Sequence, residues 1–112
     1  MSDRDLWAAQ VYKKSDTGAS GRTATFAAAD FPSNTKAIYL HWICASSIGG
    51  GTIISVNVAQ GATQLLDYTV NFENTIQHMD PPLRADISVG DVVVTLTTAA
   101  GTDYDLSAMA TP

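Results

Sequence analysis

Short segments in which apolar and polar residues alternate recur along this chain between clusters of Gly, Pro, Asn and Asp. A period of two is that of a β-strand, whose successive side chains point to opposite faces. Eight such segments separated by turn residues predict a compact antiparallel β-sandwich of the jelly-roll type. They cover residues 6–14, 22–29, 36–45, 52–59, 64–72, 83–88, 91–99 and 104–108. The alanines that end the second segment are also compatible with a helical turn.

The alternation assigns a face to each residue of the strongest segments. Residues 36–45 place four side chains on one face, namely Ile38, Leu40, Trp42 and Cys44, and three on the other, namely Tyr39, His41 and Ile43. Both faces are largely apolar, so this strand is predicted to be central and Trp42 to lie in the core. The same reasoning groups two further sets on single faces: Ile54, Val56 and Val58, which are expected to point inward, and Leu66, Tyr68, Val70 and Phe72.

Three consecutive glycines, residues 49–51, stand before the segment TIISVNVA. A phosphate-binding loop needs a helix after it and a Lys that reaches the phosphates, and neither follows here. The glycines are therefore interpreted as a hairpin turn in which Gly supplies a positive φ.

The length, net charge and cysteine content of the chain exclude several classes of function. The chain has 112 residues, which is the size of a single domain, and carries six basic against eleven acidic residues for a net charge of −5. Nucleic acids and anionic membranes select clustered basic surfaces, so neither is expected as a partner. Cys44 is the only cysteine, which excludes a disulfide within the chain. The N-terminus has no signal-peptide pattern, and assembly in a cytoplasm is expected.

No residue pattern predicts catalysis or a cofactor. His41 and His78 have no local partner, and His41 and Cys44 fall on opposite faces of one strand. Asp80, Asp86 and Asp91 do not form a calcium-loop motif, so no metal site is predicted. The alternative is a carbohydrate platform built from four aromatic residues, Trp7, Tyr12, Tyr39 and Trp42, although the core is the commoner place for such side chains.

Two segments are the candidates for contact with a partner. Residues 1–5 have no pattern that packs into a core and are predicted to form a flexible arm before the single domain of residues 6–112. The pattern lapses in residues 73–82, which are predicted to be a loop of a length that is often functional. The candidate contact residues are Asp3, Arg4, Asp5, Gln77, His78, Met79 and Asp80.

The stretch KAIYLHWICASSIGGGTIISVNV, followed by QLLDYTVNF and LRADISVGDVVVTLTTAAGTDY, resembles small jelly-roll decoration or cement proteins of tailed bacteriophages. The likeness covers roughly residues 6–108 and rests on strand order, on Ala, Gly and Thr richness, and on the late GDVVVTLTTA segment. The resemblance implies a structural protein on the capsid surface of the virion, without catalytic residues. It also implies a trimer or other ring, with the major capsid protein and copies of itself as partners.

The sequence therefore predicts a non-enzymatic head decoration protein that stabilises a phage capsid as a homotrimer. The alternative is a carbohydrate- or receptor-binding β-sandwich module of a phage tail or fibre.

Overall fold

The computed structural model describes residues 12–19, 22–48, 50–99 and 103–112, which contain eight strands and one 3-10 helix. The strands are β1 (Tyr12–Ala19), β2 (Thr23–Phe26), β3 (Ala37–Ile48), β4 (Ile53–Gln60), β5 (Thr63–Phe72), β6 (Asn74–Asp86), β7 (Val92–Thr98) and β8 (Asp103–Thr111), and the 3-10 helix η1 spans Ala28–Asp30.

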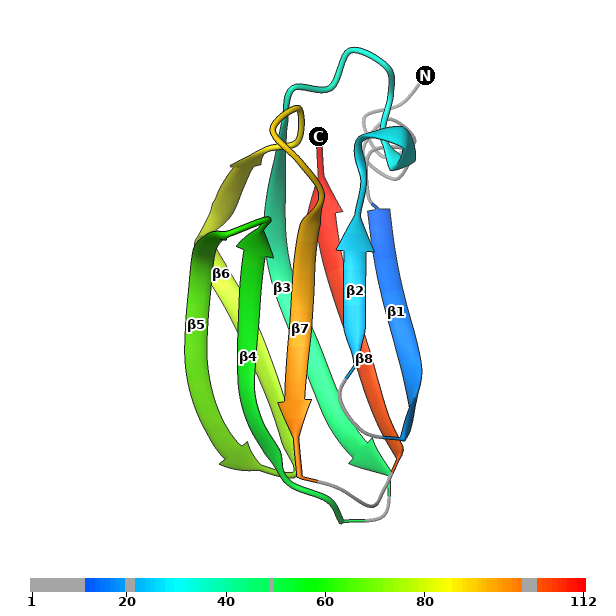
Figure 1. Cartoon of the computed structure of the whole chain (residues 1–112), viewed down its shortest axis with the longest axis vertical. Coiled ribbons are helices and arrows are strands. Elements are labelled where there is room, and N and C mark those ends of the chain that lie inside the picture. The colour runs from blue at the N-terminus through cyan, green and yellow to red at the C-terminus, as the bar shows by residue number, and fades with distance from the viewer. Residues whose placement is uncertain (1–11, 20–21, 49, 100–102) are drawn as a thin grey trace.

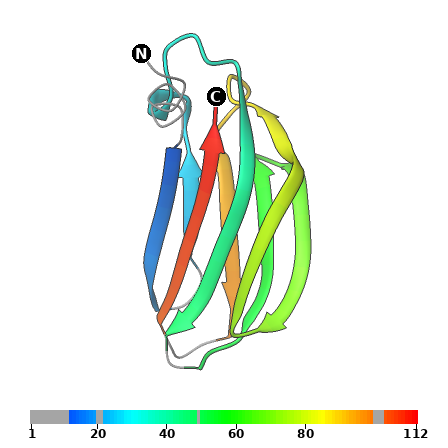
Figure 2. The same cartoon turned by 180° about the vertical axis from the view of Figure 1, so that it is seen from behind.

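The strands form two four-stranded sheets packed face to face (Figures 1 and 2). One sheet has the order β1–β8–β3–β6 and the other β2–β7–β4–β5, and all neighbouring strands are antiparallel. Successive strands alternate between the sheets except β4 and β5, which form a hairpin. This is the two-sheet jelly-roll arrangement, so the predicted fold class is confirmed.

The core fills the space between the two sheets, and none of its buried residues within the described ranges is polar or charged. In strand β7 the inward positions are all apolar: Val92, Val94 and Leu96 are buried, while the residues between them are not. Strand β8 supplies the opposite layer in the same way, with Tyr104 and Leu106 followed by small alanines. The period of two, which the sequence shows, thus accounts directly for the core of these strands.

Strand β3 contains a bulge that reverses its alternation. Its pairing with both neighbouring strands shifts between Leu40 and Trp42. Against β8, His41 is the extra residue, whereas against β6 the single His41 faces four residues of the partner strand. As a result Ile43 is buried, whereas Trp42 and Cys44 are only partly buried. The prediction that Trp42 and Cys44 share the core face of Leu40 is therefore wrong.

Strand β4 departs from simple alternation in a similar way. Its pairing with both neighbours shifts between Ile53 and Ser55. Ile53 is fully buried, and Ile54, which the sequence places inward, is 40% exposed. Val56 and Val58 are buried as predicted.

Strand β5 ends with a third departure. Asn71 has a φ of 58°, a left-handed conformation that Asn tolerates better than most residues. Phe72, which follows it, is 71% exposed instead of sharing the partly buried face of Tyr68 and Val70.

The loop predicted for residues 73–82 is mostly a strand, because β6 begins at Asn74 and continues to Asp86. Four residues of β6, numbers 79–82, lie between its pairing with Trp42 and its pairing with Leu40. They include Pro81, which follows a cis peptide bond, and Pro82. β6 is the edge of its sheet, where a missing backbone donor removes no ladder hydrogen bond on the open side. The two prolines concealed this strand in the sequence.

The structure also settles two predictions about the first strands of the chain. Strand β1 begins at Tyr12 among the described residues, and it continues through residues 15–19, which were predicted to be a turn. The alanine run ends in η1, so the helical-turn alternative is confirmed for residues 28–30. The Asp30 carboxylate accepts a 2.9 Å hydrogen bond from the Ala27 amide and closes this turn.

The glycine segment connects β3 to β4, which lie in different sheets, so it is a crossover and not a hairpin. Gly50 has a φ of 91°, as the glycine interpretation requires, and Gly49 lies outside the described residues. The β4–β5 hairpin instead turns at Gly61, whose φ is 57°.

Tyr104 stabilises the end of the sandwich where β7 ends and β4 begins. Its ring is fully buried, and its hydroxyl donates a 2.8 Å hydrogen bond to the Ala99 carbonyl. The Thr52 carbonyl lies 3.4 Å from the same hydroxyl and accepts a 3.0 Å bond from the Ala99 amide. One buried phenol thus joins the end of β7 to the chain that enters β4.

Candidate functional site

The outer face of the β1–β8–β3–β6 sheet carries an apolar stripe, which we call the outer stripe: Trp42 and Cys44 of β3, Ile76 of β6 and Met109 of β8. Trp42 pairs with Met109 on one side, and Cys44 pairs with Ile76 on the other. Ile76 is 64% exposed and the other three are partly buried. No described element covers this sheet, which Figure 2 shows from outside.

Three more side chains extend this face beyond the stripe. Tyr39 is outward because its neighbours Ile38 and Leu40 are buried. The His41 ring nitrogen Nε2 lies 2.8 Å from the Thr111 hydroxyl, and Thr111 pairs with Tyr39 across the ladder. The β3 bulge therefore gathers Tyr39, His41 and Trp42 on one surface, although simple alternation separates Trp42 from the other two.

Charged residues lie at the two ends of the same face. Asp103 and Asp105 are exposed on β8, where they pair with Ile48 and Ser46 of β3. Arg84 is exposed on β6 at the opposite end, where it pairs with Tyr39. The outer stripe lies between the acidic end and the Arg84 end.

A second surface is the edge where β5 and β6 close the sandwich, which we call the open edge. Every partly buried apolar side chain that packs against the core, within the described residues, belongs to one of these two strands. They are Leu65, Leu66, Tyr68 and Val70 of β5 and Met79 and Leu83 of β6. The core is therefore less completely covered here than between β7 and β8, whose inward residues are buried.

Tyr68 lies within the open edge with its hydroxyl shielded from solvent. Burial raises the pKa of this phenol, and the nearby Thr75 side chain opposes that effect. No hydrogen bond of normal geometry satisfies the hydroxyl among the described residues. A shielded hydroxyl without a well-formed hydrogen bond is costly, so this edge is a less favourably packed part of the sandwich than the β7–β8 side.

The structure places four of the seven candidate contact residues along β6. His78 and Asp80 are exposed, whereas Gln77 and Met79 are partly buried. Met79 packs against the core, and the Gln77 amide donates a 3.2 Å hydrogen bond to the His78 carbonyl. The other three, Asp3, Arg4 and Asp5, lie outside the described residues, so the contact role of the arm stays a prediction.

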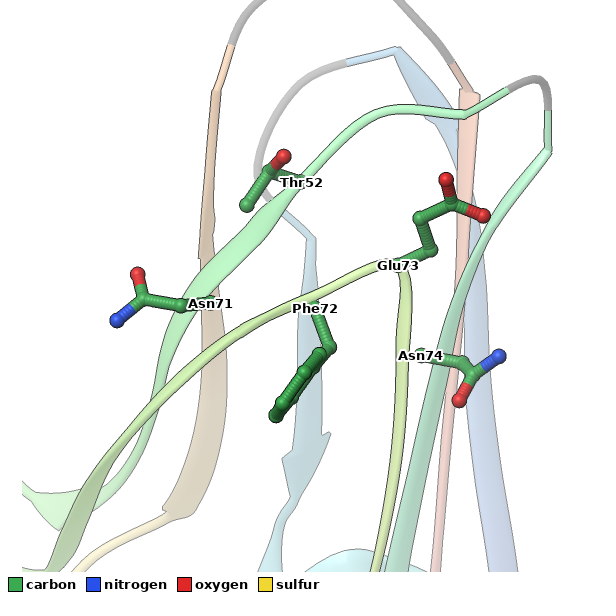
Figure 3. Close-up of a pocket in the computed structure, with 5 residues that line it drawn as sticks. All are labelled: Thr52, Asn71, Phe72, Glu73 and Asn74. Carbon is green, nitrogen blue, oxygen red and sulfur yellow. The ribbon is translucent and has the colours of Figure 1, made fainter.

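The polar depression at the β5–β6 connection does not form a small-ligand site. Thr52, Asn71, Phe72, Glu73 and Asn74 line it. Figure 3 shows the polar side chains pointing in different directions around the Phe72 ring, with Glu73 and Asn71 directed away from each other. A small polar ligand is held by groups that converge on it. The depression is better described as the rim of the open edge, with an exposed aromatic ring.

The described residues contain no group of three His, Cys, Asp or Glu side chains that could hold a metal ion. No helix among them is long and apolar enough to cross a membrane.

Sequence reasoning missed Ile76, Phe72 and Met109, which contribute to these surfaces. Ile76 was hidden because residues 73–82 were assigned to a loop. The alternation of NTIQHM was available as a signal, but its inward positions Thr75 and Gln77 are polar, and the apolar Ile76 stands at an outward one.

No protein-family model and no curated protein sequence matches the chain. Among solved structures, it is similar to a chain in the acidic stable capsid structure of Helicobacter pylori bacteriophage KHP30. The TM-score is 0.55 at 10% identity, over 92% of this chain and 88% of that chain. At this identity the likeness shows a shared fold.

Two weaker similarities have scores too low to carry an argument. One is to the C-terminal domain of A223, a structural protein from Sulfolobus turreted icosahedral virus, with a TM-score of 0.43 and 11% identity over 92% of this chain and 99% of that one. The other is to the nucleoplasmin-like N-terminal domain of Drosophila FKBP39, with a TM-score of 0.44 and 11% identity over 93% and 92%.

Proposed function

We propose that this chain is a non-enzymatic structural protein of a virus particle, and specifically a head decoration protein that binds the outside of a phage capsid and stabilises it. The observation that carries the proposal is the jelly roll shared with a chain of a phage capsid, over 92% of this chain and 88% of that one. That capsid chain is therefore also little more than one such domain. Since one fold hosts many functions, the proposal needs surfaces suited to the role.

The open edge is the surface that suits docking on a shell. Its partly buried apolar side chains gain further burial when a partner covers them, at about 25 cal/mol per Å² of apolar surface. Phe72 stands exposed at its rim, whereas His78 and Asp80 of β6 alternate with the inward Met79 and, like Ile76, lie on the outer face of their sheet. A net charge of −5 favours a partner with a basic surface. Several copies on one lattice would bind through avidity, so each contact can be modest.

The proposal is tested by mixing the purified protein with empty capsids of the phage whose genome encodes it. We expect the protein to sediment with the capsids and to raise the melting temperature of the shell. Phe72→Asp should weaken binding at least tenfold, whereas Val89→Asp should not, because Val89 is similarly exposed, at 74%, but lies in the β6–β7 turn. Absence of binding to capsids, or equal losses in the two variants, would overturn the proposal.

A second candidate function is favoured by one observation. The β3 bulge places Tyr39 and Trp42 together on the outer face, with His41 beside them, and an aromatic surface with polar neighbours suits a sugar ring. This supports the alternative of a carbohydrate- or receptor-binding module of a tail or fibre. Binding to a glycan array that is lost in Trp42→Ala, without any binding to capsids, would establish it in place of the first.

A further inference from the structure

We propose that the outer face of the β1–β8–β3–β6 sheet binds the same face of a second copy of this chain, around a two-fold axis that crosses the outer stripe. The stripe offers apolar contact on a surface that no described element covers. Ile76 is the clearest sign, because a 64% exposed Ile stands directly beside Cys44 on the outside of a sheet. The pairing is independent of the capsid proposal.

The charges of this face argue for a second copy as the occupant. Asp103 and Asp105 lie at one end of the face and Arg84 at the other. The midpoint along β3 between Ser46, opposite Asp105, and Tyr39, opposite Arg84, falls at the outer stripe. A two-fold axis there turns the acidic end of one copy toward the Arg84 end of the other. A self-complementary patch of this kind is what an isologous dimer requires.

The face is also large enough for a stable dimer interface. The four strands have 8, 9, 12 and 13 residues, and at about 3.3 Å per residue and about 4.8 Å between strands they outline roughly 670 Å². A stable interface of standard size buries about 800 Å² on each partner. The trimer predicted from the sequence needs two different surfaces on each copy, whereas this face complements itself, so the two-fold pair is the expected assembly.

The first experiment measures the mass of the full-length protein by sedimentation equilibrium over a range of concentrations. A dimer is expected. Ile76→Lys should raise the dimer dissociation constant at least tenfold, because it places a charge in the apolar stripe. Ile54→Lys is the matched control, since this exposed Ile lies on the other sheet, and it should leave the dissociation constant unchanged. Circular dichroism checks that both variants fold.

The second experiment tests the charge pattern. Arg84→Glu and Asp103→Lys should each weaken the dimer about tenfold, since each places like charges at the two ends that meet. The double variant should recover most of the loss, because the reversed charges complement one another again. Recovery would not follow if the two residues acted only within their own chain at opposite ends of the face.

The third experiment uses Cys44 as a probe. Sheets packed face to face lie about 10 Å apart, too far for a disulfide but within reach of a short bismaleimide. The reagent should link two copies through Cys44 in the native protein and fail in Ile76→Lys.

A monomer or a trimer at all concentrations would overturn the pairing, as would equal effects of Ile76→Lys and Ile54→Lys. Because Phe72 and the open edge lie outside this face, loss of capsid binding in Phe72→Asp with an intact dimer would separate the two proposals.

Discussion

The bulge in β4 makes a sharp prediction about two neighbouring isoleucines. The pattern of alternation places Ile54 in the core, but the structure buries Ile53 completely and leaves Ile54 40% exposed. Ile53→Ala should therefore lower the free energy of unfolding by about 2–5 kcal/mol, which is the range for a fully buried Ile. Ile54→Ala should cost less than about 1 kcal/mol, close to the scale of surface substitutions.

Urea denaturation followed by tryptophan fluorescence distinguishes these outcomes. With a urea m value of about 1–3 kcal/mol/M, a loss of 3 kcal/mol moves the midpoint by at least about 1 M. The two variants remove the same atoms from adjacent positions, so composition and chain entropy cancel between them. Measurements at low protein concentration keep self-association from adding to the difference. An equal or larger loss in Ile54→Ala would refute the assigned register of β4.

Three further predictions concern single side chains. Tyr104→Phe should lower the unfolding free energy by about 1 kcal/mol, because the partly buried hydrogen bond from its hydroxyl to the Ala99 carbonyl is lost; an unchanged urea midpoint would contradict this. Trp42→Ala should cost less than Ile43→Ala in the same assay, since Ile43 is fully buried and Trp42 is not; the reverse order would return Trp42 to the core. The Ser88 hydroxyl and amide hold the pKa of Asp86 below its ordinary value of 3.8, so the ionised form stabilises the fold above that pH and the benefit disappears as pH falls through the lowered pKa. Asp86→Asn should therefore be less stable than the native protein at pH 7 and approach its stability near pH 2; a difference between the two proteins that does not change with pH would contradict this.

Local patterns predicted most of the fold because they report burial directly. Strand β7 alternates without interruption, and the expected segment 91–99 contains the observed Val92–Thr98. The hairpin at Gly61 was likewise visible as a glycine between two alternating runs. These features depend on residues close together in the chain, which one sequence displays.

The departures depend on strands that are distant in sequence. The bulge at His41 exists relative to β8, and no local feature of KAIYLHWICA marks which residue is extra. The β6 strand was hidden for another reason. Pro81 and Pro82 usually exclude a strand, but an edge strand tolerates them, and edge position is a property of the assembled sheet. The candidate surfaces were therefore harder to predict than the core.

The three departures from alternation have a common consequence. Each moves an apolar side chain from its predicted inward position to a more exposed one: Trp42 at the β3 bulge, Ile54 at the β4 bulge and Phe72 after Asn71. Ile54 and Phe72 lie at the same end of one sheet, where Ile53 pairs with Phe72, and Trp42 lies on the outer face of the other sheet.

An apolar side chain turned toward water forfeits burial that a regular strand would have supplied, so such irregularities are expected where a partner restores it. The two locations coincide with the two surfaces proposed for binding. Trp42 lies in the outer stripe, where a second copy would cover it, and Phe72 stands at the rim of the open edge, where a capsid would. Deletion of His41 removes the extra residue but keeps Trp42 outward between the inward Leu40 and Ile43, so it should preserve both self-association and the docking of Phe72, whereas Ile76→Lys and Phe72→Asp should each impair only one of them.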